Sequence, residues 1–225
     1  MRLMEEYIYD FKQVINKFEE IDKTINRKLN IYLIGGAVLL YAKLKSGTKD
    51  IDLVVNHKKD YDLLTTVLKK SNFLIEKPTK EYSRFNLENI LVKDNYRIDI
   101  FNKIVCKNLF LSKNMIKRAK LVKAYNNIQL YVCSNEDILV FKTITDREGD
   151  IDDCYNLSLQ NLNWDTILSE IKYQVTKSGN EIWVTWFEER LNLLEDRKIY
   201  IPIIIEIRKL SHTYYTKLEA KLKEE

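Results

Sequence analysis

The pattern that most constrains this chain is a pair of glycines followed, one helix later, by two aspartates in a strand. Residues 31–34 are Ile-Tyr-Leu-Ile, a composition typical of a short strand, and Gly35-Gly36 ends the run. Residues 37–44 favour a helix, and a Ser-Gly-Thr loop separates them from Asp50. Asp50 and Asp52 are two positions apart in the next predicted strand, so both side chains leave the same face.

This arrangement has a specific chemical use. Two neighbouring carboxylates repel each other unless a cation lies between them, and Mg²⁺ binds through carboxylates and phosphate oxygens. Glycines before a helix let backbone N–H groups approach a phosphate closely. Taken alone, a Gly-Gly pair is usually a turn and an Asp-x-Asp pair is often a solvated strand edge. Together and in this order, they favour nucleotidyl transfer.

The spacing of Gly35-Gly36 and Asp50-Ile-Asp52 resembles the signature of the nucleotidyltransferase superfamily, which has the DNA polymerase β-like fold. This resemblance implies an α/β (α+β) fold, with a mixed sheet flanked by helices and followed by a helical C-terminal region. It also implies that Asp50 and Asp52 coordinate a catalytic Mg²⁺ or Mn²⁺ ion. The two glycines would hold the triphosphate of a nucleoside triphosphate substrate.

A third carboxylate comes from a later predicted strand. Residues 96–101 alternate, so that Ile98 and Ile100 face one way while Arg97 and Asp99 face the other. The superfamily resemblance makes Asp99 the third metal ligand or the general base that takes the acceptor's proton. The alternative is an aspartate solvated at a strand edge. Arg84 and Arg97 are candidates for phosphate contact or for surface salt bridges.

A second informative stretch covers residues 134–153. Ser134 and Asp137 form a variant capping box that predicts the start of a helix. Lys142 is an isolated cation in the apolar part of this helix, and its spacing fits a lysine at the core edge as well as a phosphate ligand. Arg147 and three aspartates follow, where acidic residues favour the start of another helix.

This stretch narrows the resemblance. Asp137-Ile-Leu-x-x-Lys142, then Arg147, then Asp150-x-x-Asp153 is similar to the last two motifs of the AbiEii/MenT group of nucleotidyltransferases, which are toxins of toxin–antitoxin pairs. By this resemblance Lys142 contacts the nucleotide phosphates and is counted with the catalytic residues. Arg147 and Asp153 belong to the nucleotide-binding set, with Asp153 orienting the two basic side chains.

The chain departs from the group at two motif positions. Gly36 stands where the group usually has a serine, so the hydroxyl that contacts phosphate is missing there. Arg97 stands where the group has lysine. Neither change removes a predicted metal ligand.

The rest of the sequence predicts how the chain is divided into domains, helices and strands. We predict a nucleotidyltransferase domain over residues 1–155 and a helical region over 156–225. Predicted helices cover 4–28, 60–71, 112–125, 164–175 and 181–194, and predicted strands cover 73–75, 83–87, 90–92 and 128–133. Residues 199–208 begin as a possible strand, and a charged helix follows. The lysines of 112–125 form either a solvated face or a means of attracting an anionic substrate.

Composition restricts the setting in which such a protein works. The 225 residues are 45% hydrophobic and 31% charged, which is ordinary for a soluble globular protein. Cys106, Cys133 and Cys154 are odd in number and lack metal-site spacing, which fits free thiols in a reducing compartment. No apolar run reaches membrane-spanning length. We therefore expect a cytoplasmic protein without a membrane partner, and the net charge of +4 permits a nucleic acid as partner.

These observations predict transfer of a nucleoside monophosphate from a nucleoside triphosphate to a hydroxyl group. In the toxin-like relatives the acceptor is RNA, namely a tRNA 3′ end, or a protein side chain, and the sequence does not choose between them. A toxin would also have a cognate antitoxin protein as partner. Two other classes of function stay open: a nucleotide-binding regulatory protein on the same scaffold without turnover, and an interaction protein that uses its C-terminal helices.

Overall fold

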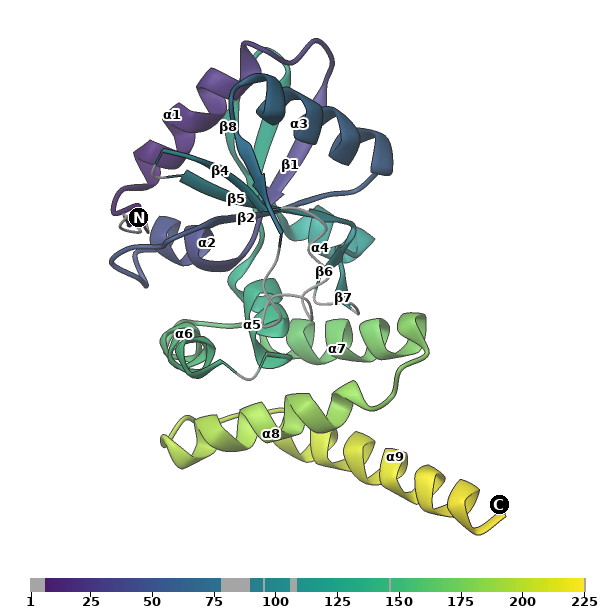
Figure 1. Ribbon diagram of the computed structural model, residues 1–225. Coiled ribbons are helices and arrows are strands. Elements are labelled where there is room, and N and C mark those ends of the chain that lie inside the picture. The colour runs from purple at the N-terminus through teal and green to yellow at the C-terminus, as the bar shows by residue number, and fades with distance from the viewer. Residues whose placement is uncertain (1–6, 78–89, 95, 106–108, 146, 225) are drawn as a thin grey trace. The chain divides into compact units, whose positions relative to one another are not determined.

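The computed structural model describes residues 7–77, 90–94, 96–105, 109–145 and 147–224 of the chain. These residues belong to two compact units, Met1–Ser134 and Asn135–Glu225. In the ribbon diagram the first unit contains the sheet and the second consists of helices (Figure 1). The mixed sheet, its flanking helices and the helical C-terminal region confirm the predicted fold class.

The first unit is built on one large sheet. Its helices are α1 (Phe11–Asp22), α2 (Gly35–Tyr41), α3 (Lys58–Lys70) and α4 (Lys113–Arg118). Its strands are β1 (Leu29–Leu33), β2 (Ile51–Val55), β3 (Leu74–Glu76), β4 (Ile90–Lys93), β5 (Tyr96–Asn102), β6 (Ile104–Val105), β7 (Leu109–Phe110), β8 (Lys120–Ala124) and β9 (Ile128–Val132). Within the described residues, seven strands form a sheet in the order β3-β4-β5-β2-β1-β9-β8, and β6 pairs with β7.

The strand β2 has a central place in this sheet. It runs antiparallel to β1 and parallel to β5, and the β2–β5 register places Asp52 opposite Asp99. Their apolar neighbours on these strands are buried, with Leu53 and Ile98 inaccessible to solvent. Helix α2 packs on β2, and α3 packs on β2, β4 and β5. The buried apolar strands therefore form a rigid frame for the carboxylates that they carry.

The first helix is shorter than the predicted 4–28. It begins at Phe11, because Asp10 and Gln13 form a capping box at its N-terminus. Before the cap, Ile8 forms a β-bridge with Thr48, with backbone hydrogen bonds of 2.7 and 2.9 Å. This pairing fixes residue 8 in an extended conformation, which the apolar spacing of the sequence did not reveal.

The predicted helix over 112–125 is wrong beyond residue 118. Ser112 caps α4 through the backbone N–H of Met115, and the helix ends at Arg118. The next residues form the edge strand β8, which pairs antiparallel with β9. The apolar spacing of 119–124 suits a strand as well as a helix, and the pairing with β9 decides the outcome. The lysines Lys120 and Lys123 therefore lie on a sheet edge, where charge discourages further strand pairing.

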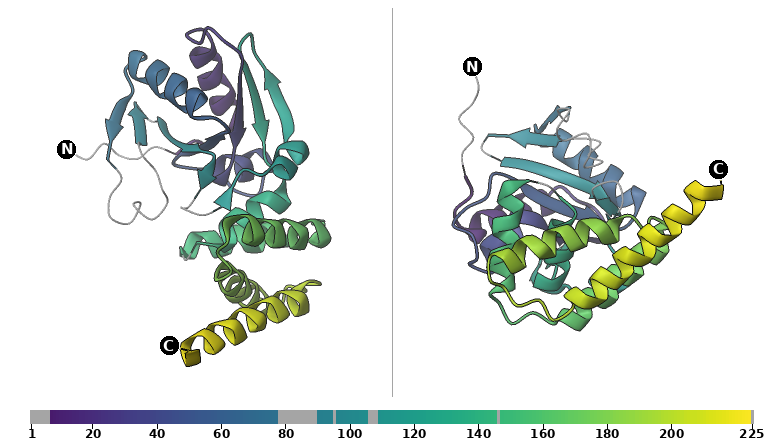
Figure 2. Two further views of the ribbon diagram at one scale, coloured as in Figure 1. Left: turned by 90° about the vertical axis from the view of Figure 1, so that its right-hand side faces the viewer. Right: turned by 90° about the horizontal axis from the view of Figure 1, so that it is seen from below.

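The second unit contains α5 (Asn135–Thr143), α6 (Glu148–Ser158), α7 (Trp164–Ser178), α8 (Trp183–Asp196) and α9 (Ile204–Glu224). Its core includes Trp183, Phe187 and Leu191 of α8. Helix α5 packs on α6, α7 and α8, and α9 packs on α8 (Figure 2).

Two sequence predictions in the remainder of the chain have different outcomes. The possible strand at the start of 199–208 is wrong, because residues 201–203 lead directly into α9. The predicted strand at 83–87, together with Arg84, lies outside the described residues. Among the described residues, no helix is long and apolar enough to cross a membrane. The functional boundary after residue 155 stays a prediction.

Candidate active site

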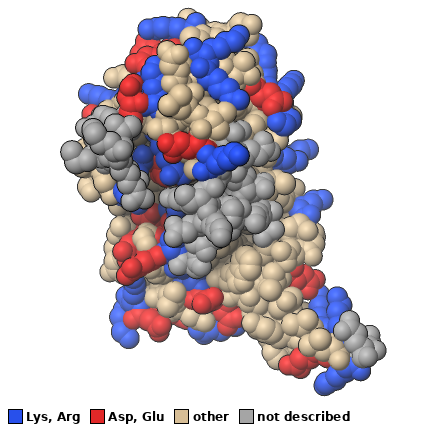
Figure 3. Space-filling model, in the orientation of Figure 1, with Lys and Arg blue, Asp and Glu red and all other residues tan. Residues whose placement is uncertain are grey.

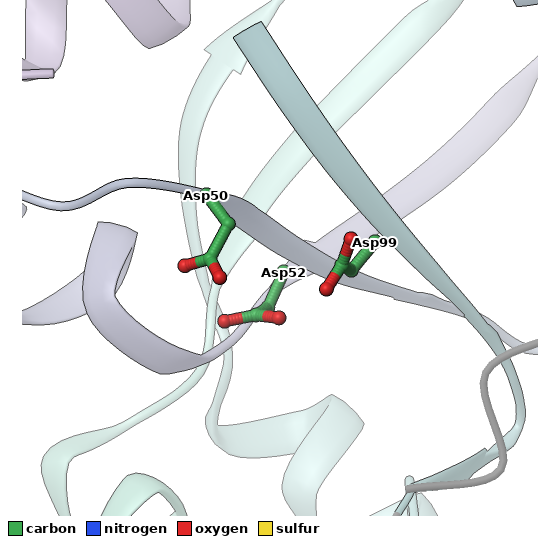
Figure 4. A group of neighbouring side chains, drawn as sticks. All are labelled: Asp50, Asp52 and Asp99. Atoms are coloured by element: carbon green, nitrogen blue, oxygen red, sulfur yellow. The ribbon is translucent and has the colours of Figure 1, made fainter. Parts of the chain in front are cut away.

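Three aspartates converge on one side of the central strands. Asp50 immediately precedes β2, Asp52 lies within β2, and Asp99 lies opposite Asp52 on the parallel neighbour β5. One carboxylate oxygen from each lies within 4.8 Å of the others. Figure 4 shows the three side chains directed toward a common space. Asp50 and Asp52 are half-buried and Asp99 is buried. Three carboxylate oxygens at this spacing are a donor set that suits Mg²⁺ or Mn²⁺.

Gly35 leaves room for the Asp52 carboxylate because it has no side chain. Its φ of +62° lies in the left-handed region that glycine adopts without a steric penalty. A Cβ atom at this position would lie 2.1 Å from Oδ2 and 3.0 Å from Cγ of Asp52. The backbone N–H of Ile34 also donates to the Asp52 carbonyl at 3.0 Å. The glycine turn and the acidic cluster are therefore one local structure, joined at Asp52.

Gly36 is required for a different reason. A Cβ atom there would lie 2.3 Å from the hydroxyl oxygen of Thr48, which is buried. The same hydroxyl donates to the Asp50 carbonyl at 3.1 Å and lies 3.5 Å from the Asp50 carboxylate. A serine at position 36 would need Thr48 to move. Sequence reasoning missed Thr48, because a threonine in a Ser-Gly-Thr loop reads only as a turn residue.

Asp99 already has a basic partner on its own strand. Arg97 forms a two-pronged ion pair with it, with Nε 3.0 Å from Oδ1 and Nη2 2.8 Å from Oδ2. The Asp99 side chain is 2% exposed, and the Arg97 side chain is 22% exposed. The pair compensates the charge of a buried carboxylate, which would otherwise be costly to bury. Arg97, at the position where the toxin-like group has lysine, thus lies beside the acidic cluster.

The other predicted site residues form a polar cluster within the second unit. Lys142 of α5 lies 2.5 Å from Asp150 and 2.7 Å from Asp153 of α6, and all three are buried. The Asp150 carboxylate also accepts from the Thr145 hydroxyl at 2.5 Å and from Arg147 at 2.7 Å. Asp150 is thus the central acceptor of the cluster. The sequence pattern places Asp150 in a motif and at the start of a helix, but does not predict this central role.

The charges in this cluster shift the pKa values of its members. Burial alone would raise the pKa of Asp150, but the Lys142 charge and the hydrogen bonds and charge of Arg147 lower it to about 2. Burial alone would lower the pKa of Lys142, but Asp150 and Asp153 raise it above its ordinary value. Lys142 therefore stays charged at all pH values at which the protein would be studied.

The shifted pKa of Asp150 predicts acid sensitivity. The folded value of about 2 lies below the ordinary value of 3.8, so ionised Asp150 contributes stability above about pH 4 and loses it as pH falls through 2. We expect the difference in free energy of unfolding between wild type and Asp150→Asn to shrink by about 1 kcal/mol between pH 6 and pH 3. Urea titrations of both proteins at several pH values measure it. A constant difference would contradict the assignment.

Comparison with known proteins adds a family to this geometry. Comparison with curated proteins gave no match. Among solved structures, the crystal structure of ANT(2″)-Ia in complex with adenylyl-2″-tobramycin is similar at a TM-score of 0.48 and 9% sequence identity. The match covers 74% of this chain and 98% of that chain.

A family description, "Nucleotidyltransferase of unknown function (DUF6036)", matches residues 9–195. The match includes the glycine turn, all three converging aspartates and the polar cluster around Asp150. It extends over most of the chain, from the residue before the α1 cap to the last turn of α8. The chain is therefore a member of this family of nucleotidyltransferases.

Proposed function

We propose that this protein is a divalent-metal-dependent enzyme that transfers a nucleoside monophosphate from a nucleoside triphosphate to an acceptor hydroxyl. The observation that carries the proposal is the convergence of Asp50, Asp52 and Asp99 within 4.8 Å. Like charges held this close repel one another, which favours a bound cation, and phosphoryl transfer uses such a cation together with the phosphates of the substrate. Membership of a nucleotidyltransferase family supports the reaction class.

Each site residue has a role in this proposal. Asp50 and Asp52 would hold Mg²⁺ or Mn²⁺, with Asp99 as a third ligand or as the general base. When bound, the metal would supply charge stabilisation on the phosphate oxygens. Gly35 and Gly36 would let the backbone approach the triphosphate. The acceptor oxygen would form a bond to the α-phosphorus, the bond to pyrophosphate would break, and the acceptor proton would go to the base.

The finer identity of the enzyme rests on the resemblance to the toxin-like group. We propose that the acceptor is an RNA, such as a tRNA end, or a protein hydroxyl, and that a cognate antitoxin protein restrains the activity. In this proposal Lys142 and Arg147 carry positive charge for the nucleotide phosphates and Asp153 orients Lys142. The 2.7 Å contact between Lys142 and Asp153 supports the orienting role.

Calorimetric titration of each nucleoside triphosphate, with and without Mg²⁺, tests the proposal. We expect one or more triphosphates to bind wild type only with Mg²⁺. Asp50→Asn/Asp52→Asn should weaken that binding by more than about a hundredfold, because even outer-shell changes at metal sites cost 10- to 100-fold. Asp62→Asn/Asp94→Asn is the matched control, since it removes two charges from exposed positions of the same unit. Binding that ignores both Mg²⁺ and the site variant would refute the metal site.

A second candidate function is nucleotide binding without turnover. It is favoured by one observation, the two-pronged pairing of Asp99 with Arg97, which occupies both oxygens of the carboxylate needed as ligand or base. Labelled-nucleotide transfer separates the two functions. Metal-dependent binding without transfer to total RNA or to any protein would select the second candidate, and Arg97→Lys would then show whether weaker pairing restores transfer.

A further inference from the structure

A hollow lined by aromatic and basic side chains lies beside the loop that leads from α2 to Asp50. Its volume is about 530 Å³. The residues that matter here are Tyr9, Phe11, Tyr41, Lys43 and Lys45. All of them belong to the first unit, where the segment entering α1 is bridged to this loop by the Ile8–Thr48 pair. The proposed reaction gives this hollow no role.

Two aromatic side chains of this region, Tyr7 and Tyr9, are exposed, and two others, Phe11 and Tyr41, are half-buried. Tyr9 is 67% exposed and Tyr7 is 42% exposed, and their rings stack with centroids 5.9 Å apart. Phe11 and Tyr41 form a second, tilted pair at 4.9 Å. Tyr9 is also held from behind, because a Cβ atom at Gly47 would lie 3.0 Å from its ring. Exposed rings that are fixed in place cost little entropy when a planar partner stacks on them.

Positive charge accompanies these rings. The loop carries Lys43, Lys45 and Lys49 with no acidic residue between the first and the last. The ammonium of Lys49 lies 5.5 Å from the centre of the Tyr7 ring, and that of Lys120 lies 5.5 Å from the centre of the Tyr41 ring. Among the described residues that line the hollow, Asp10 is the one acidic residue, and it accepts the Lys12 backbone N–H as the cap of α1.

On the face drawn in Figure 3, Lys and Arg side chains are interspersed with Asp and Glu. The net charge of +4 is also small for 225 residues. A general attraction for polyanions therefore does not explain the lysines of this loop. Their association with stacked aromatic rings is what distinguishes this region.

The hollow is tied to the acidic cluster by a short length of backbone. Gly47 supports Tyr9, Thr48 donates to Asp50, and Lys49 joins them. Three residues of extended chain span at most about 11 Å. A nucleic acid strand with one base stacked on Tyr9 would consequently reach the predicted metal ligands within a few nucleotides.

We propose that these residues, Tyr7, Tyr9, Phe11, Tyr41, Lys43, Lys45, Lys49 and Lys120, form a tyrosine–lysine surface that binds the single-stranded end of a nucleic acid acceptor. Bases stack on aromatic rings while lysines neutralise the backbone, as in other single-strand binding sites. This inference rests on the proposed function and selects a nucleic acid over a protein as acceptor. The surface chemistry is shared by RNA and DNA, and the test below separates them.

Fluorescence anisotropy with labelled twelve-nucleotide RNA and DNA strands tests binding in the absence of nucleoside triphosphate. Wild type should bind with a slope of log K against log salt of about −3, if the four lysines each neutralise one phosphate. Tyr9→Ala should weaken binding by about five- to 150-fold through lost stacking. Lys43→Gly should reduce the slope by about 0.7.

Matched controls exist in the second unit. Lys198 ends α8 in the same left-handed conformation as Lys43 after α2, with φ of 67° and 59° and the same pair of closing backbone hydrogen bonds. Glycine suits both positions, so Lys198→Gly and Lys43→Gly remove one charge each without strain. Tyr200, at 83% exposed, is the control for Tyr9. Both controls should bind the strands like wild type.

The outcomes separate this inference from the function on which it rests. Weaker binding in Tyr9→Ala and Lys43→Gly, with unchanged binding in the controls, supports the surface, and the tighter of the two strands identifies the acceptor. Equal effects in the control variants, or binding of a poly-glutamate peptide in place of both strands, would overturn it. Asp50→Asn/Asp52→Asn should keep strand binding, so a failed metal site would leave this result intact.

Discussion

Gly35→Ala should abolish most nucleotidyl transfer while leaving the protein folded. The added Cβ would lie 2.1 Å from Oδ2 of Asp52 and close to two further atoms of that side chain. The carboxylate can swing aside, but doing so removes it from the cluster with Asp50 and Asp99. A misplacement of about 1 Å at a reacting centre costs about a hundredfold in rate, so we expect a loss of that size or more. Metal affinity should fall with it.

The effect on stability should be much smaller. Forcing alanine to a φ of +62° costs about 1–3 kcal/mol. Gly149→Ala is the matched control, because nothing lies within 4 Å of a Cβ atom at that helical position and alanine favours a helix. Transfer rates, Mn²⁺ affinity and urea unfolding of both variants give the comparison. An active Gly35→Ala protein would show that Asp52 is not needed where the structure places it.

Lys142→Met should cost about 3–5 kcal/mol in free energy of unfolding, the second large effect that we expect. Its ammonium lies 2.5 Å from Asp150 and 2.7 Å from Asp153, and all three side chains are at most 9% exposed. Removing one partner of a buried ion pair leaves uncompensated charge in the protein interior, which accounts for the magnitude. Arg147 retains its contact with Asp150, so part of the charge compensation in the cluster remains. Urea unfolding at pH 7 measures it.

A charge-compensated variant separates stability from nucleotide binding. Lys142→Met/Asp150→Asn/Asp153→Asn removes the buried charges together and should recover a large part of the lost stability. If Lys142 also contacts phosphate, the recovered protein will still bind nucleoside triphosphate weakly in calorimetry. Wild-type affinity in the triple variant would limit Lys142 to a structural role. Failure to recover stability would contradict the ion-pair explanation.

The glycine–aspartate unit shows what could be predicted from the sequence. Strand, turn, helix and strand are encoded in adjacent residues, so their identity and the shared face of Asp50 and Asp52 follow from local rules. The position of Asp99 could not be predicted from local rules, because its place opposite Asp52 depends on a parallel pairing between strands far apart in the chain. The superfamily resemblance supplied that pairing, which periodicity alone does not give.

Other features lay beyond local rules. Residues 119–124 have a pattern that fits two structures, and only β9, which pairs with them, decides between these. Asp22 at the end of α1 accepts hydrogen bonds from the backbone N–H groups of residues 126–128. No short sequence motif predicts this contact between distant residues. The contact of the Thr48 hydroxyl with Asp50 could not be predicted from local rules either, because the hydroxyl fits there only where Gly36 has no side chain.

The parallel register of β2 and β5 makes the acidic cluster a reporter of folding. Asp52 and Asp99 face each other only in the native pairing, because a shift of one residue turns an entire strand's side chains to the other face. Strand pairs so distant in sequence form slowly, since the loop between them must close first. A bound cation would therefore recognise any state in which β2 and β5 are paired in their native register, and it would stabilise that state through its affinity for the cluster. Metal binding during refolding would thus time the pairing of β2 with β5.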